Sequence, residues 1–162
     1  MLISSDTQDT LGRSWTEPHD QAWTGRAPAL PSRRAVAGYT TVVVRGGPDT
    51  LAKLAMHARR THDAYVLDGE PLWGISVYCA LDDVGPASLD GLLRRFNSYR
   101  AVHLPRTGQL RSAGFSLLPS FGRPHYTIRL DGDDPAVLGR LLDALGPTEA
   151  NKYHRRQQPG RR

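Results

Sequence analysis

The sequence predicts an α/β (α+β) fold, in which a mixed sheet of about four to five strands is covered by three helices. Two observations carry this prediction. In the first half, runs of β-branched and aromatic residues alternate with segments whose leucines recur at helical spacing. In the second half, two short strand-like runs flank a turn and precede one more amphipathic helix. The predicted element order is βαβαβββα, and no internal repeat interrupts it.

The first strand and helix are predicted around a Gly-Gly-Pro sequence. Residues 39–44 form a run of aromatic and β-branched side chains, which favour a strand. The sequence 46–48 is expected to end that strand in a turn. Asp49 or Thr50 can then cap a helix that ends near His62, because leucines and alanines follow at helical spacing.

The next three elements follow the same logic. Residues 75–81 are mostly apolar, which predicts a strand inside the sheet. Ser88 begins a helix whose apolar stripe contains Leu89, Leu92, Leu93 and Phe96. Residues 101–104 form a short candidate strand, and the following turn to Gly114 has space for one helical turn.

A hairpin and a closing helix complete the predicted domain. The strands 115–118 and 126–130 flank a turn segment over residues 119–124 and should be antiparallel neighbours. Asp134 caps the last helix, with Pro135 at its first position. Its inward face is predicted to contain four leucines: Leu138, Leu141, Leu142 and Leu145.

The two ends of the chain differ in composition from the middle. We predict a flexible leader at 1–37, a single folded domain at 38–146 and a basic flexible tail at 147–162. No apolar run is long enough to span a membrane, and no export signal is visible, so a cytoplasmic location is expected. Cys79 is the only cysteine and is expected to be a buried, inert thiol.

One candidate site is an anion site at the first strand-to-helix junction. Gly46 and Gly47 would let a ligand approach the backbone, and the helix that Thr50 begins would offer free amides. Arg45 can add a bidentate contact to a phosphate or carboxylate. The third glycine of a dinucleotide fingerprint and the lysine of a P-loop are both absent.

A second candidate is a pocket near His125 and Ser76. The sequence His125-Tyr126-Thr127-Ile128 resembles half the signature of the two-histidine phosphoesterases, in which two such motifs surround one phosphodiester. This chain has one copy, since the strand with Ser76 lacks the second histidine. The alternative interpretation is that His125 has no catalytic role and is a strand histidine with a local hydrogen bond.

Two further resemblances are partial. Val44-Arg45-Gly46 is similar to the first element of mono-ADP-ribosyltransferases, whose strand arginine contacts the phosphates of NAD; Ser76 stands alone where those enzymes have Ser-Thr-Ser, and no predicted strand contains a glutamate. The sequence 43–47 and the segment 114–128 resemble small proteins of high-GC Gram-positive bacteria. That resemblance implies no function.

Charge is concentrated at the C-terminal end. The net charge is +5, and the tail contains a cluster of basic residues: Lys152, Arg155, Arg156, Arg161 and Arg162. Such a tail can hold nucleic-acid phosphates without reading their sequence. The alternative interpretation is that the tail binds nothing and only increases the solubility of the protein.

Three functions therefore stay open. The first is a small accessory protein that associates with nucleic acid through its tail. The second is a nucleotide-using enzyme, ADP-ribosyltransferase-like or phosphoesterase-like, with the anion site at Arg45-Gly46-Gly47. The third is a protein-interaction domain without catalysis, whose partner the sequence does not identify. No histidine has the spacing of a metal site, and no cofactor motif is complete.

Overall fold

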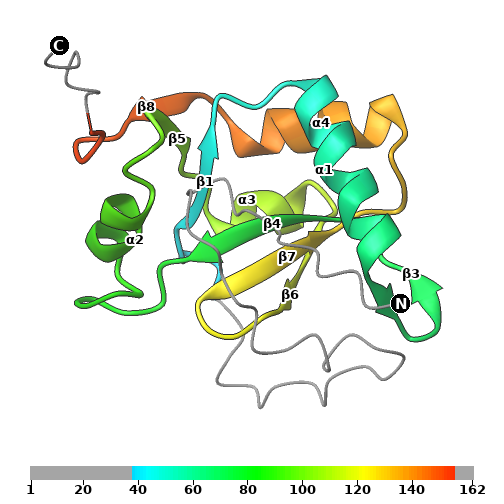
Figure 1. Cartoon of the computed structure of the whole chain (residues 1–162), viewed down its shortest axis with the longest axis horizontal. Coiled ribbons are helices and arrows are strands. Elements are labelled where there is room, and N and C mark those ends of the chain that lie inside the picture. The colour runs from blue at the N-terminus through cyan, green and yellow to red at the C-terminus, as the bar shows by residue number, and fades with distance from the viewer. Residues whose placement is uncertain (1–37, 156–162) are drawn as a thin grey trace, which may run out of the picture.

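The computed structural model describes residues 38–155, and its centre is a six-stranded sheet with the order β6-β7-β4-β1-β5-β8 (Figure 1). Its strands are β1 (Val43–Gly47), β4 (Gly74–Cys79), β5 (Ala101–His103), β6 (Ser116–Pro119), β7 (His125–Arg129) and β8 (Thr148–Ala150). The predicted α+β class is confirmed, as is the antiparallel hairpin of β6 and β7. All pairings of this sheet are antiparallel, and β8 adds a strand that was not expected.

Four helices accompany the sheet in the described residues: α1 (Leu51–Ala64), α2 (Leu89–Arg95), α3 (Thr107–Ser112) and α4 (Pro135–Leu145). The predicted caps are present, because Thr50, Ser88 and Asp134 each accept a hydrogen bond from a backbone N–H in the first turn. The single turn expected before Gly114 is the short helix α3. None of these helices is long and apolar enough to cross a membrane.

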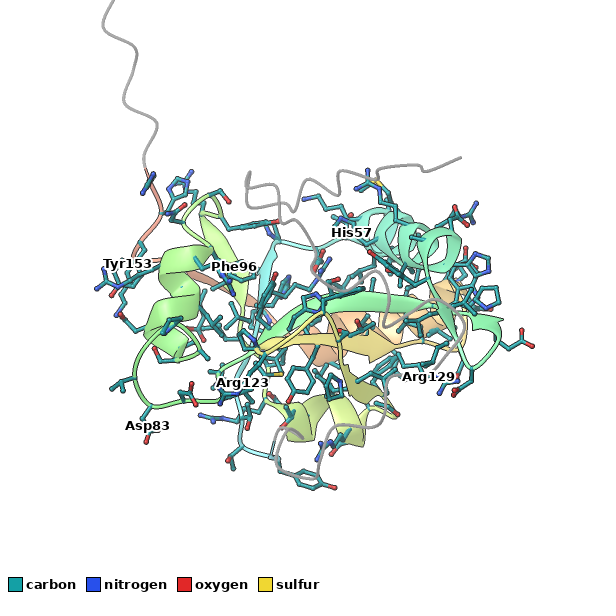
Figure 2. The ribbon with its side chains drawn as sticks, turned by 60° about the horizontal axis from the view of Figure 1, so that its bottom comes forward. His57, Asp83, Phe96, Arg123, Arg129 and Tyr153 are labelled. Carbon is teal, nitrogen blue, oxygen red and sulfur yellow. The ribbon has the colours of Figure 1, made fainter. Side chains whose placement is uncertain are left out.

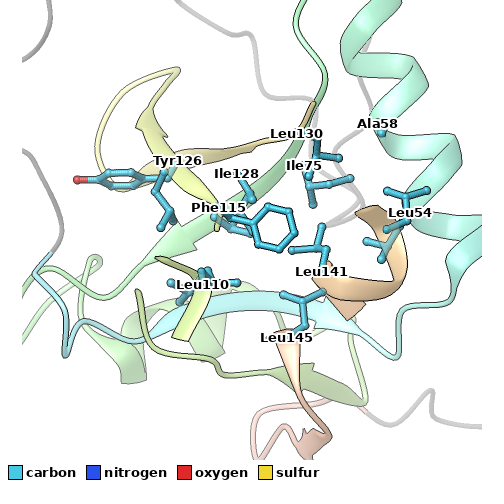
Figure 3. Packing of buried hydrophobic residues seen from close by; sticks show 14 of the residues in the cluster. Leu54, Ala58, Ile75, Leu110, Phe115, Tyr126, Ile128, Leu130, Leu141 and Leu145 are labelled. Atoms are coloured by element: carbon cyan, nitrogen blue, oxygen red, sulfur yellow. The ribbon is translucent and has the colours of Figure 1, made fainter. Parts of the chain in front are cut away.

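The helices divide unequally between the two faces of the sheet. Helices α1, α3 and α4 pack on one face, which we call the helical face, and their leucines meet strand residues such as Ile75 and Ile128 (Figure 3). Helix α2 lies at one end of the molecule on the other face (Figure 1), where Leu92 and Phe96 pack on Val44 and Val102. The alternation of strand side chains then assigns each remaining strand residue to one face.

A small hairpin was missed by the sequence analysis. Its strands β2 (Val66–Leu67) and β3 (Glu70–Pro71) pair with each other just after α1. The two residues between them, Asp68 and Gly69, have φ angles of 52° and 83°, which suit a tight hairpin turn. Two-residue strands give almost no periodic signal, which is why the sequence predicts no element between residues 62 and 75.

The ends of the folded part also differ from the prediction. Strand β1 continues through Gly46 and Gly47, which pair with Val102 and Ala101 of β5, so the expected turn does not begin at Gly46. At the other end, β8 pairs with β5 along three residues and lies in the segment that we had assigned to the tail. Its sequence, Thr-Glu-Ala, is polar because an edge strand is held mainly by backbone hydrogen bonds. The predicted leader, 1–37, lies outside the described residues.

Candidate functional site

The register of the sheet separates the candidate residues into two groups. Arg45 is directly opposite His103 on β5, and both side chains are on the helical face. Ser76 is opposite Thr127, and Tyr78 is opposite His125, all on the face that α2 partly covers. Ser76 and His125 therefore share one surface, whereas the Arg45 side chain lies on the other side of the sheet.

Arg45 belongs to a buried network. Its Nε donates to Asp49 Oδ2 at 2.6 Å and its Nη2 donates to Asp49 Oδ1 at 3.1 Å, a side-on bidentate pair. Its Nη1 donates to the Ser76 carbonyl at 2.9 Å. Both side chains of the pair are less than a tenth exposed. These contacts hold the guanidinium in place and join β1, the start of α1 and β4.

His103 completes this network. Its Nε2 accepts a hydrogen bond from the Asp49 backbone N–H at 3.0 Å, so the proton must be on Nδ1. Nδ1 then donates to the Gly146 carbonyl at 2.8 Å, just beyond the end of α4. Both ring nitrogens of His103 are thus used inside the fold.

The other residues of the predicted anion site also have structural partners. A Cβ on Gly46 would lie 2.3 Å from the Tyr99 ring, and one on Gly47 would lie 2.7 Å from the ring of His103. Glycine is required at both positions because these side chains pack directly on the backbone. The Thr50 hydroxyl accepts from the Lys53 N–H at 3.2 Å and caps α1.

His125 is part of a second polar cluster, with Ser120 and Thr127. Its Nδ1 is 3.1 Å from the Ser120 carbonyl and 2.8 Å from Ser120 Oγ. A carbonyl oxygen only accepts, so Nδ1 bears the proton and Nε2 has the free lone pair. Ser120 Oγ is also 2.8 Å from Thr127 Oγ1. Within residues 38–155, no side chain or backbone group hydrogen-bonds to Nε2 of His125.

Aromatic rings surround this histidine. The rings of Tyr78 and Phe121 meet the imidazole edge to face, with centroids 5.1 and 5.2 Å away. Burial, chiefly, and the positive charge of Arg95 lower the pKa of His125 from 6.5 to about 4. The imidazole is therefore neutral at physiological pH and presents Nε2 as an acceptor.

The start of the predicted tail is docked on α2. Asn151 is buried, and its Nδ2 donates to the carbonyls of Leu93 and Phe96 at the end of that helix. Asp90 accepts from the Tyr153 hydroxyl and forms ion pairs with Lys152 and Arg94, at 2.9 and 3.0 Å. The hydrogen bond from Tyr153, followed by those from the two cations, lowers the pKa of Asp90.

These contacts extend the candidate nucleic-acid surface beyond the tail. Arg155 is exposed and its N–H donates to the Asn97 carbonyl, next to α2. Arg156, Arg161 and Arg162 lie outside the described residues. The arginines of α2 are not among the residues that the sequence predicts to bind nucleic acid. Their spacing within one helix gives no sign that the C-terminal segment returns to pack beside them.

Two further groups have perturbed pKa values. Cys79 is buried, as predicted. Its burial raises the pKa of the thiol to about 12. Burial and the nearby Arg45 lower the pKa of His57 to about 4. Among residues 38–155, no three or more His, Cys, Asp or Glu side chains gather as a metal site would require.

No protein-family model, curated protein or solved structure matches this chain. The candidate sites therefore stand on their geometry alone. Of the two polar networks, the one at Arg45 is closed by its own hydrogen bonds, and the one at His125 keeps an acceptor without a partner in the described residues.

Proposed function

We propose that this protein associates with nucleic acid, without reading its sequence, through a basic surface at the α2 end of the molecule. We call this surface the basic end, and it consists of Arg94, Arg95, Arg100, Lys152 and Arg155. Phosphate contacts of this kind supply most of the affinity of sequence-independent binding.

The observation that carries the proposal is the anchoring of the C-terminal segment by Asp90. One carboxylate holds Tyr153, Lys152 and Arg94 together, so the segment begins on the surface of α2. Asp90 is ion-paired with two of the five basic groups of the basic end, Arg94 and Lys152, and the sequence has three more arginines in its last seven residues. The described part of the C-terminal segment therefore adds Lys152 and Arg155 to the charge of α2.

Several acidic residues lie away from the basic end. The hairpin of β2 and β3 contains Asp68 and Glu70, and the loop before α4 contains Asp131, Asp133 and Asp134. Figure 2 shows Tyr153 and Phe96 at one end of the molecule and Arg129 toward the other.

Tyr153 adds an aromatic element to the basic end. The Arg94 guanidinium carbon lies 4.2 Å from the centroid of its ring, and Lys152 Nζ lies 5.0 Å from it. Cations above a ring of this kind hold the segment in place and leave other donors of the guanidinium for phosphate oxygens.

The test removes charge at two places in the full chain. One variant is Arg100→Gln/Arg155→Gln/Arg156→Gln, and its matched control is Lys53→Gln/Arg60→Gln/Arg140→Gln, with the same change of net charge elsewhere. Binding to labelled single-stranded and duplex oligonucleotides is measured from low to physiological salt. For the first variant we expect roughly a tenfold loss and a salt slope shallower by about 2 to 3 on duplex DNA, at roughly 0.9 per lost contact.

The control variant should keep the slope of the natural protein. Equal losses in the two variants would show that net charge alone matters, and would contradict a basic end. Absence of binding by the natural protein at low salt would refute the proposal and favour the protein-interaction alternative.

A further inference from the structure

Two successive arginines of the basic end, Arg94 and Arg95, lie over two different aromatic rings. Arg94 lies over the ring of Tyr153 at the basic end. Arg95 lies over the ring of Tyr78, with 5.3 Å between its guanidinium carbon and the ring centroid. Tyr78 is in turn in edge contact with His125. The basic end is therefore continuous with the sheet surface that contains His125.

This sheet surface has the composition of a site for a flat, polar ring. Phe121 approaches His125 from the hairpin loop, and the buried ring of Phe96 packs edge to face against Tyr78, at 5.4 Å between centroids. The surface thus combines aromatic rings, one guanidinium and one neutral imidazole. Proteins that hold single-stranded nucleic acid use these groups to receive unstacked bases.

His125 supplies the hydrogen-bonding feature of the surface. Its orientation is fixed, because Nδ1 is engaged by Ser120 and Ser120 is engaged by Thr127. Nε2 is an acceptor that no described residue satisfies, in a side chain that is only partly exposed. An acceptor in such surroundings favours a ligand that brings an N–H donor, since leaving it unpaired costs free energy.

We propose that the surface formed by Ser76, Tyr78 and His125 receives an unpaired nucleobase, whose exocyclic amino or ring N–H group donates to Nε2 of His125. The phosphates beside this base would contact Arg95 and the other basic groups of the basic end. This inference rests on the proposed function, and it narrows the substrate to nucleic acid with unpaired bases.

Ser76 offers a test that leaves the core unchanged. It is exposed on β4 between Gly74 and Tyr78, so Ser76→Trp places a large side chain on the proposed surface. Ser116 is exposed on the same face of the sheet, on β6, and Ser116→Trp is the matched control.

The experiment measures the affinity of the full chain for a single strand, for the same strand with abasic sites, and for a duplex. Ser76→Trp should weaken single-strand binding at least about fivefold, the low end of what one stacked base contributes, and leave duplex binding unchanged. Ser116→Trp should change neither. Equal affinity of the natural protein for the normal and the abasic strand would overturn the inference.

A second variant addresses the hydrogen bond itself. His125→Leu should reduce binding of the normal strand and leave binding of the abasic strand unchanged, with circular dichroism to confirm the fold. Should Ser76→Trp and His125→Leu both bind all three ligands as the natural protein does, the base site would be refuted. The basic end would then still stand or fall by its own charge variants.

Discussion

His103 and His125 occupy similar positions in the sheet, but their Nε2 atoms differ in hydrogen bonding. Each lies on a strand of the same sheet, and each directs Nδ1 at a backbone carbonyl, Gly146 in one case and Ser120 in the other. For His103, Nε2 accepts the Asp49 N–H, and the ring is enclosed by the helical face. For His125, Nε2 has no hydrogen-bond partner among residues 38–155.

This difference in hydrogen bonding distinguishes polar residues that stabilise the fold from polar residues that can bind a ligand. A histidine whose two ring nitrogens are both hydrogen-bonded within the protein stabilises the structure and has no nitrogen left to bind a ligand. A histidine held rigidly at one nitrogen, with the other unpaired, is positioned for a partner. The predictions below separate these two roles.

The largest effect is expected when the network of His103 is broken at Asp49. Asp49→Ala leaves the Arg45 guanidinium buried without its carboxylate, which should lower the free energy of unfolding by about 3–5 kcal/mol. Urea unfolding followed by circular dichroism gives the measurement. The double variant Arg45→Met/Asp49→Ala removes both charges and should recover part of the loss. A single variant within about 1 kcal/mol of the natural protein, the value of an exposed pair, would mean that the network is not structural.

The two histidines can be compared by the same substitution. His103→Leu leaves the Asp49 N–H and the Gly146 carbonyl unpaired, which should cost about 2–4 kcal/mol. His125→Leu should cost about 1 kcal/mol, because Ser120 Oγ keeps its bond to Thr127. Chemical unfolding of the two variants side by side is the measurement. Equal losses, or a larger loss at His125, would contradict the distinction between them.

The smallest effect is a dependence of stability on pH. The pKa values of His57 and His125 are lowered to about 4, so between pH 6.5 and 4 the unfolded chain binds protons that the folded chain does not. Stability should therefore fall as the pH falls through this window, by about 1 kcal/mol for His125 between pH 7.5 and 5.5 and by less for His57, whose partly exposed ring is screened by solvent.

The His125→Leu variant sharpens this prediction. Its stability should decline less steeply between pH 7.5 and 5.5 than that of the natural protein, with His57 responsible for the remainder. Thermal melts at matched ionic strength would show it. Identical pH profiles of the two proteins would indicate that His125 is solvated and titrates normally.

Much of the fold could be predicted because its signals are local. The caps at Thr50, Ser88 and Asp134 and the leucines of α4 mark helices that form where expected. Three of the four predicted leucines, Leu138, Leu141 and Leu145, are buried, and Leu142 is partly buried against the same core. Strand β8 has no such signal, since its pairing with β5 depends on backbone groups brought together by the whole fold.

The sites were harder to predict because their meaning depends on the register of the sheet. Gly46 and Gly47 have the composition of a phosphate-binding turn, and only the pairing with β5 shows that Tyr99 and His103 occupy the space beside them. The two hydrogen-bond partners of Arg45, the Asp49 carboxylate and the Ser76 carbonyl, are 4 and 31 residues away from it along the chain. Ser120 was assigned to a turn, and its bonds to His125 and Thr127 follow from the loop geometry.

The most direct test of the account follows the two imidazoles by nitrogen-detected NMR while a single-stranded oligonucleotide is added to the full chain at low salt. We predict that the Nε2 resonance of His125 shifts in proportion to the bound fraction and that both nitrogens of His103 stay unchanged. An oligonucleotide that binds while Nε2 of His125 stays unchanged, or that moves His103 as much as His125, would contradict the account.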